Sequence, residues 1–159
     1  ERREISFGIG SKPAFICDVA SGNYYIEFEN DEKNIKILRE QRGLILDKNS
    51  VINDNLIIDD KYIFLGENTF DFGVIILENI TSKKIYLKCK EDNREILSMG
   101  FNDFPYLSIW SKRNAPFICL GPSFSVSDKK DIDSDFFNKE NIVHLKPLEE
   151  FECSYYIYF

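Results

Sequence analysis

Histidine, tryptophan and methionine are almost absent from this chain. Its 159 residues include one of each, and the single histidine is His144. Without a second histidine, a histidine-based metal site or an internal histidine relay is not expected, so acid–base chemistry would have to come from carboxylates, lysine or tyrosine. His144 lies in an alternating stretch, 141–145, and is interpreted as a surface or edge residue.

Cysteine occurs four times but never in a Cys-x-x-Cys pair, so a metal or redox motif is not expected. The surroundings of Cys89, Cys119 and Cys153 are apolar or alternating, which favours buried free thiols. Reduced thiols are typical of the cytoplasm. No apolar run approaches the ~18 residues of a transmembrane helix, and no signal peptide is recognisable. We predict a cytoplasmic protein that binds no metal and no cofactor.

A basic surface is also missing. The formal net charge is −7, and the pairs Lys83-Lys84 and Lys129-Lys130 are interpreted as solvated turn charges. Binding to nucleic acid or to an anionic membrane requires a cluster of positive charge. Neither partner is therefore expected.

Aromatic residues, in contrast, are abundant. The chain contains 14 phenylalanines and 8 tyrosines, which favour strands. Short apolar or alternating runs recur every ~10 residues between turns rich in Asn, Asp and Lys. This pattern predicts an all-β fold in a single domain, 1–159. The stretch 55–64 is ambiguous between a short helix and two short strands.

Residues 101–128 contain the clearest local pattern. Two apolar runs, 106–110 and 115–120, flank a polar turn, which predicts a hairpin of buried strands. The second run leads into Gly121-Pro122, which is interpreted as a turn that presents side chains at the rim of a sheet. Gly73 and Gly121 are both interpreted as glycines needed for turn geometry.

The sequence of this stretch, FPYLSIWS followed by APFICLGP, resembles the galactose mutarotase (aldose 1-epimerase) family. The residues that match the family pattern are Phe104, Pro105, Tyr106, Leu107, Ile109, Trp110, Ser111, Pro116, Phe117, Ile118, Cys119 and Pro122. The segments FGIGSKPAF (7–15) and IILENITSKKIYLK (75–88) are similar to family segments too. The resemblance implies a galactose mutarotase-like β-supersandwich, of which this chain would form the C-terminal portion.

Members of that family are about twice as long as this chain. The resemblance therefore implies a missing N-terminal half, which would supply further strands and an arginine that grips the sugar. Strand edges left unpaired by its absence would be a liability. We expect the chain to pair with another chain, with the missing half or with itself.

The positions matched to the family's catalytic residues are substituted. Lys12 stands where the family has its general acid, a histidine before Pro-Ala-Phe, and Gly121 stands where it has its catalytic base, a glutamate before proline. Ser123 replaces the tryptophan after that proline. Ungapped alignment places Gly73 at the family's sugar-holding acid, and Asp71, two residues away, would share its face in a strand.

Three functions are compatible with the resemblance. The first is a carbohydrate-binding mutarotase-like protein, catalytically impaired or inactive, that holds a hexose. The second is an active aldose 1-epimerase that interconverts the α and β anomers of a hexose with the lysine as acid, although a glycine cannot serve as the base. The third is a structural subunit that binds no sugar. The side chains expected to line a sugar site are Phe15, Asp71, Ser123, Phe124 and Ser125.

Overall fold

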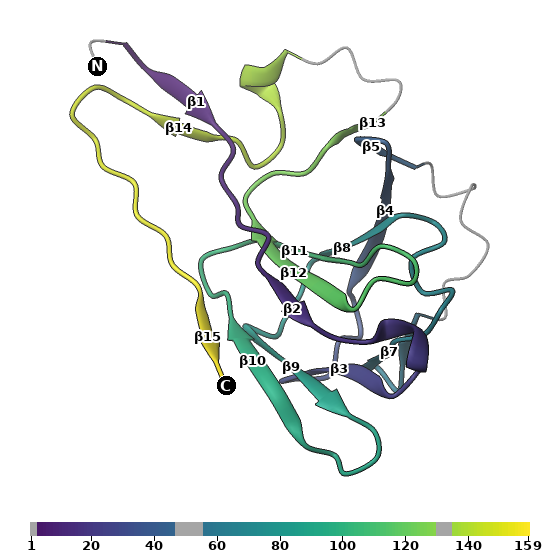
Figure 1. The fold of residues 1–159 in the computed structure, drawn as a ribbon. Helices are drawn as coiled ribbons and strands as arrows, with labels where there is room; N and C mark the ends of the chain where they lie inside the picture. The colour runs from purple at the N-terminus through teal and green to yellow at the C-terminus, as the bar shows by residue number, and fades with distance from the viewer. Residues whose placement is uncertain (1–2, 47–55, 130–134) are drawn as a thin grey trace.

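Strands make up nearly all of the regular structure in the computed structural model, which describes residues 3–46, 56–129 and 135–159 (Figure 1). Within these ranges the helical segments are two short 3₁₀ turns, η1 (Val19–Ser21) and η3 (Phe136–Asn138). The strands are β1 (Ile5–Phe7), β2 (Ala14–Ile16), β3 (Tyr24–Phe28), β4 (Lys36–Gln41), β5 (Leu44–Ile45), β6 (Ile57–Ile58), β7 (Tyr62–Phe64), β8 (Val74–Glu78), β9 (Lys84–Cys89), β10 (Glu95–Gly100), β11 (Tyr106–Trp110), β12 (Phe117–Ser123), β13 (Asp128–Lys129), β14 (Val143–Leu145) and β15 (Tyr156–Tyr158).

The strands form two large sheets, which confirms the predicted all-β class. One sheet has the order β15-β10-β9-β3-β7-β6, and the other has the order β13-β5-β4-β8-β11-β12-β2. All neighbours are antiparallel except β13 and β5, which run parallel. The ambiguous stretch 55–64 contains two short strands, β6 and β7, which pair with each other. None of the described helical segments is long and apolar enough to cross a membrane.

The main core lies where the two sheets face each other. Alternate residues of a strand point to opposite faces of its sheet, and the inward residues are Ile, Leu, Phe and Met. Ile26, Ile75, Leu87 and Ile109 are each 0% exposed. A smaller apolar cluster of Leu38, Ile45, Ile76 and Tyr106, flanked by Val74 and Val126, lies on the outer face of the seven-stranded sheet. The outer face of the seven-stranded sheet therefore also carries buried apolar side chains and is only partly exposed to solvent.

The predicted hairpin forms, but its second strand is longer than expected. β11 and β12 pair from Trp110 opposite Cys119 to Tyr106 opposite Ser123. The interpretation of Gly121-Pro122 as a turn is wrong, because both residues lie within β12. Pro122 has no N–H to donate, yet its carbonyl still accepts a hydrogen bond from the Ser11 N–H at 3.0 Å. The strand therefore continues through the proline to Ser123.

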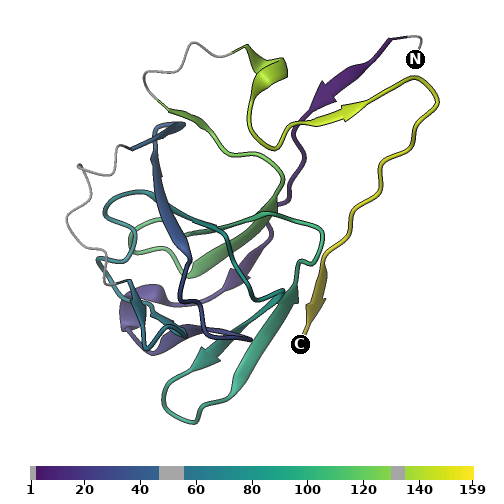
Figure 2. The ribbon, with the colours of Figure 1, turned by 180° about the vertical axis from the view of Figure 1, so that it is seen from behind.

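A two-stranded ribbon stands apart from the main sheets. β1 pairs with β14, and the chain then runs back along the molecule to β15 (Figures 1 and 2). His144 lies on this ribbon, as predicted for an edge residue, and its Nδ1 is 2.9 Å from the Ser6 hydroxyl. The ribbon and the returning chain form the projecting part of the molecule.

The four cysteines are free, but only Cys17 is buried. Burial raises the pKa of the Cys17 thiol to about 12. Cys89, Cys119 and Cys153 are half-buried, so their prediction as buried thiols is wrong. Cys119, for example, points to the outer face of its sheet, because its neighbours Ile118 and Leu120 fill the core face.

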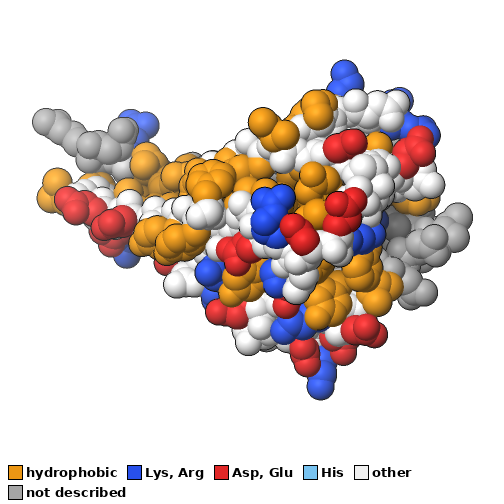
Figure 3. Space-filling view, turned by 60° about the horizontal axis from the view of Figure 1, so that its bottom comes forward, with side chains coloured by type: hydrophobic (Ala, Val, Ile, Leu, Met, Phe, Trp, Pro, Cys, Tyr) orange, Lys and Arg blue, Asp and Glu red, His pale blue; other side chains and the backbone are white. Residues whose placement is uncertain are grey.

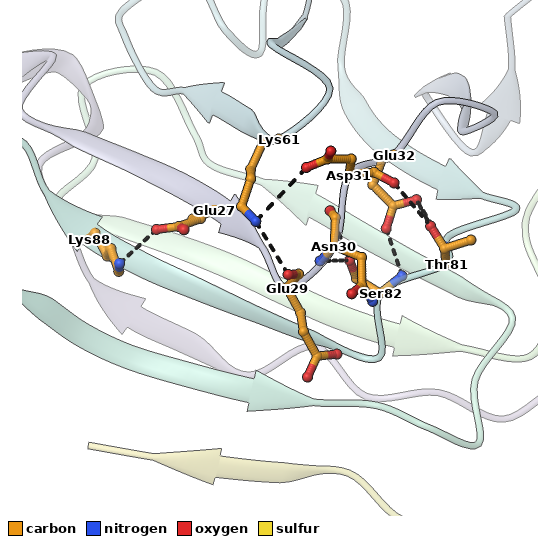
Figure 4. Close-up of polar contacts among 9 residues, drawn as sticks. All are labelled: Glu27, Glu29, Asn30, Asp31, Glu32, Lys61, Thr81, Ser82 and Lys88. Carbon is orange, nitrogen blue, oxygen red and sulfur yellow. Dashed lines mark hydrogen bonds and ion pairs between the residues drawn. The ribbon is translucent and has the colours of Figure 1, made fainter.

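The buried Glu32 side chain links two turns at one end of the sandwich by hydrogen bonds (Figure 4). It is 2% exposed, and its carboxylate accepts hydrogen bonds from the Ser82 N–H at 2.6 Å, the Thr81 N–H at 2.9 Å and the Thr81 hydroxyl at 2.7 Å. Burial acts to raise the pKa of Glu32, but the hydrogen bonds from Ser82 and Thr81 outweigh it and hold that pKa below its usual range. The folded chain therefore favours the ionised form of the Glu32 carboxylate.

Candidate functional site

The candidate site is a cleft on the outer face of the seven-stranded sheet, made of two adjoining hollows. The first, called here the glycine hollow, has a volume of about 310 Å³ and is lined by Gly8, Ile9, Gly10, Ser11, Lys12, Ser123 and Ser125. The second, called here the sheet hollow, has the same volume and is lined by Lys12, Glu40, Val74, Ile76, Ser108, Ser123, Ser125, Val126, Ser127 and Lys139. They share Lys12, Ser123 and Ser125, so the two hollows meet at these three side chains.

The pairing register of the strands explains which residues form the floor of the cleft. Ser108 on β11 lies opposite Ile76 on β8 and opposite Gly121 on β12. Ile76 in turn lies opposite Leu38 on β4. Residues directly opposite each other share one face of a sheet, so these four form a row across the outer face. Gly121 ends this row beside Lys12.

The segment before β2 runs closely alongside β12. The Ser11 N–H donates to the Pro122 carbonyl at 3.0 Å, and Gly10 forms an isolated bridge with Ser123. A Cβ added to Gly10 would lie 2.7 Å from the Ser123 Cβ, and one added to Gly8 would overlap the Ser125 hydroxyl. Gly10 is therefore needed for the segment to approach β12 this closely, because a Cβ there would also meet the Pro122 carbonyl oxygen at 2.9 Å. This approach places Lys12 over the sheet.

Lys12 and Gly121, the two positions matched to the family's acid and base, lie together. A Cβ built on Gly121 would be 2.5 Å from the Ser108 Oγ, 2.8 Å from the Ser11 carbonyl oxygen and 3.2 Å from the Lys12 Cγ. Such distances are shorter than van der Waals contact. The space in which a side chain at position 121 would begin is therefore filled by its neighbours.

The charged groups of the cleft differ in how they are engaged. The Lys139 ammonium is 2.7 Å from the Asp128 carboxylate, and the Ser127 hydroxyl donates to the Glu40 carboxylate at 2.7 Å. Lys12 forms no ion pair with any described residue. Burial raises the pKa of the Cys119 thiol, and the Lys12 ammonium partly offsets that rise. The Lys12 ammonium thus lies in the cleft without an ion-pair partner among the described residues.

Phe15 and Phe124, the two aromatic residues predicted to line the sugar site, lie outside the cleft. Phe15 packs against the main core, with its ring centroid 6.3 Å from that of Phe159. Phe124 packs against Phe104 at 5.1 Å and Phe151 at 5.2 Å. Neither lines the glycine hollow or the sheet hollow. Ser123, the predicted residue next to Phe124, lines both, because successive residues of an extended chain face opposite ways.

Asp71 is separated from Lys12 and Gly121. It is exposed and lines a different hollow, beside the ion pair in which Arg113 Nη2 lies 3.0 Å from Glu67 Oε1. Positions 71–73 form a turn before β8, so the expectation of a shared strand face does not apply. The interpretation of Gly73 as a turn glycine is confirmed: its φ is +85°, and a Cβ there would overlap the Glu40 carbonyl oxygen.

Five polar residues that line the cleft were not found by sequence reasoning: Ser11, Glu40, Ser108, Ser127 and Lys139. Ser108 lies in the recognised stretch, and its position opposite Gly121 in a hairpin could have identified it. Glu40 reaches the cleft through the pairing of β4 with β8. Lys139 reaches it from the chain after η3. Glu40 and Lys139 depend on contacts between distant parts of the chain and carry no local signal.

A scan against protein-family models finds no match, whereas known proteins and solved structures similar to this chain are found. The plasmid-encoded protein LacX of Lactococcus lactis subsp. lactis is 26% identical over 161 residues, covering 96% of this chain and 52% of LacX, and the chromosomal LacX gives the same values. The structure of a galactose mutarotase related enzyme from Lactobacillus acidophilus superposes with a TM-score of 0.80 at 22% identity, covering 98% of this chain and 52% of that one.

A second solved structure agrees. A galactose mutarotase-like protein from Lactobacillus casei superposes with a TM-score of 0.73 at 23% identity, over 99% of this chain and 53% of that chain. The chain spans about half the length of the curated relatives it matches. Its strands adopt the β-sandwich fold of galactose mutarotase-like proteins.

Proposed function

We propose that this chain is the C-terminal half of a mutarotase-like protein that binds a hexose in the cleft and has lost efficient anomer exchange. The fold shared with two galactose mutarotase-like proteins and the similarity to LacX support a place in that family. The proximity of Lys12 and Gly121, which the resemblance matches to the acid and base, supports the cleft as the sugar site.

The observation that carries the proposal is the filled space above Gly121. Mutarotation needs a base that removes a proton from the anomeric hydroxyl and an acid that protonates the ring oxygen. A glycine has no group that accepts a proton, and Ser108, Ser11 and Lys12 occupy the volume from which a carboxylate would project. The packing of the cleft therefore leaves no space for a carboxylate at position 121, which supports the proposed loss of the base.

The rest of the cleft is suited to a sugar. Its two hollows, each about 310 Å³, fall in the size range of small-molecule sites. Serine hydroxyls, the Glu40 carboxylate and the Lys12 ammonium can donate to and accept from sugar hydroxyls. The cleft thus retains polar groups for binding while one of the two catalytic groups is missing.

Proton NMR with α-glucose and α-galactose tests the proposal, because saturation transfer reports binding and the anomeric signals report exchange. We expect transfer from the protein to the sugar and exchange at the buffer rate. Absence of transfer for both sugars would overturn the sugar-binding proposal and favour a structural subunit. Exchange above the buffer rate that is abolished by Lys12→Ala would overturn the loss of catalysis.

One observation favours residual epimerase activity as a second candidate. Glu40 and Lys12 line the same hollow, so a carboxylate and an ammonium are both available to a bound ring. If exchange is observed, Glu40→Gln should reduce it to the buffer rate while leaving saturation transfer in place. An unchanged exchange rate in this variant would exclude Glu40 as the base.

The proposal includes a partner half and a cytoplasmic location. The edge strands β2 and β15 of the two sheets lie near each other, since the rings of Phe15 and Phe159 are 6.3 Å apart. Ile16 on β2 is 90% exposed and Phe159 is 93% exposed. Apolar side chains also gather on the projecting ribbon and the returning chain (Figure 3). These surfaces fit strands supplied by the other half, and the four free thiols suit a reducing compartment.

A further inference from the structure

A third hollow lies outside the cleft, between the loop that joins β10 to β11 and the chain that leads into β14. It is called here the loop hollow. Its volume is about 460 Å³, and none of its lining residues lines the glycine hollow or the sheet hollow. Its apolar lining residues are all buried or half-buried: Phe104, Pro105, Phe124, Ile142 and Val143. The loop hollow therefore has an apolar floor, as small-molecule sites commonly do.

The polar residues of the loop hollow include one charge of each sign. Lys83, Asn102, Asp103 and Asn141 are all exposed, so they form a rim around the apolar floor. Neither Lys83 nor Asp103 forms an ion pair with a described residue, and the two are therefore not paired with each other. A ligand with a single charge would match one of these groups and be repelled by the other. The rim thus favours a ligand that carries both an anionic and a cationic group.

Hydrogen bonds hold the loop around the hollow in place. The Phe101 N–H donates to the Lys83 carbonyl at 2.9 Å, and the Phe104 N–H donates to the Phe101 carbonyl at 3.0 Å. Asp103 Oδ2 accepts from the Ser154 N–H at 2.7 Å and from the Ser154 hydroxyl at 3.2 Å, whereas Asp103 Oδ1 forms no hydrogen bond with the described residues. The loop is therefore positioned before a ligand binds, which reduces the entropy lost on binding.

We propose that the loop hollow binds a free amino acid with a large apolar side chain, with its α-carboxylate at Lys83 and its α-ammonium at Asp103. A free amino acid carries both charges on one carbon at neutral pH, which matches the two unpaired charges of the rim. Its side chain lies on the apolar floor, where the half-buried ring of Phe124 is an aromatic partner. A hexose suits this hollow less, because it has no charge and its hydroxyls would face the apolar floor. The site is separate from the cleft and stands whether or not the cleft binds a hexose.

Isothermal titration and saturation-transfer NMR with L-phenylalanine at pH 6, where α-amino groups are protonated, test the inference. Three matched ligands each lack one feature: glycine lacks the apolar side chain, N-acetylphenylalanine lacks the ammonium and phenylalanine amide lacks the carboxylate. We expect L-phenylalanine to bind at least about tenfold more tightly than glycine. We also expect it to bind about fivefold more tightly than each of the two blocked derivatives.

Two substitutions separate the roles of the two rim charges. Asp103→Asn should abolish the preference for L-phenylalanine over the acetyl derivative and keep the preference over the amide, since an asparagine oxygen can still accept from Ser154. Lys83→Met should have the reverse effect. Asp18→Asn and Lys33→Met, which remove exposed charges outside the hollow, are the matched controls and should change neither preference. A general loss of folding would weaken binding of all four ligands together.

The remaining outcomes would contradict this inference. Equal affinities for L-phenylalanine and both blocked derivatives would overturn the assignment of the two charges. Glycine that binds as tightly as L-phenylalanine would show that the apolar floor holds no side chain. Glucose that displaces L-phenylalanine in a competition titration would mean that the loop hollow holds a sugar and not an amino acid. No binding of L-phenylalanine would overturn the inference and leave the proposed hexose site in the cleft unaffected, because the two sites share no lining residue.

Discussion

At the level of single residues, Gly121 is the position on which the packing of the cleft depends. Alanine there should lower the free energy of unfolding by about 1–3 kcal/mol, because its Cβ would meet the backbone oxygen of Ser11 and the Ser108 hydroxyl. Urea unfolding of the Gly121→Ala variant measures this change. Gly66→Ala is the matched control, since a Cβ at Gly66 meets no atom within 4 Å. A Gly121→Ala variant as stable as the Gly66→Ala variant would contradict the packing described for the cleft.

Glu32 gives a prediction on pH. Because its pKa is lowered in the folded chain, its contribution to stability is complete above its unfolded-state value, about 4.3, and is lost as the pH falls through the lower folded value. Glu32→Gln should cost about 1–3 kcal/mol at pH 7, since the amide cannot accept all of the hydrogen bonds from Thr81 and Ser82.

Urea unfolding at pH 7, 4 and 3 checks this prediction for Glu32. The difference between the wild-type chain and Glu32→Gln should shrink as the pH falls, because protonation removes the wild-type carboxylate as well. Glu29→Gln, in the same turn but exposed (Figure 4), should differ little from wild type at every pH. If the free energies of unfolding of wild type and Glu32→Gln differed by the same amount at all three pH values, ionisation of Glu32 would not account for the stabilisation.

At the level of strands, the sequence predicted the alternating elements and the hairpin well, because these depend on local patterns. It failed at Gly121-Pro122, where two residues typical of turns lie inside β12. The carbonyl of Pro122 still bonds to Ser11, a residue more than a hundred positions earlier. That contact holds the strand extended, and no local pattern reports it.

The edge strand β2 gives a prediction on association. Its side chain Ile16 is 90% exposed, and among the described strands β2 pairs only with β12. An exposed apolar edge favours strand pairing between copies, and lysine on an edge opposes it. Ile16→Lys should weaken self-association of this chain about tenfold, or ~1.4 kcal/mol, as measured by sedimentation over a concentration series.

Leu148→Lys provides the control for Ile16→Lys. Leu148 is 100% exposed but lies outside the strands, so the same change of charge and polarity should leave association nearly unaltered. Equal effects of the two variants would point to general surface hydrophobicity. No concentration dependence in the wild-type chain would mean that the β2 edge does not pair with other copies.

At the level of the whole molecule, the residues that line the candidate cleft were predicted in part. Lys12, Gly121 and Ser123 lie together as the resemblance implied, because two segments with matched motifs run alongside each other. Phe15 and Phe124 were assigned to the cleft on residue type alone, but they point into the core. Glu40 and Lys139 come from distant segments. A single sequence specifies local pattern, while the face on which a side chain lies and its distant neighbours depend on how the sheets assemble.

The close packing around Gly121 also has a historical meaning. For a chain descended from a protein with a carboxylate at this position, the change to glycine allowed a backbone oxygen and two side chains to move into the vacated volume. A glutamate introduced there alone would place its Cβ 2.8 Å from the Ser11 carbonyl oxygen. In such a chain, a return to glutamate would therefore require the backbone at Ser11 to move as well.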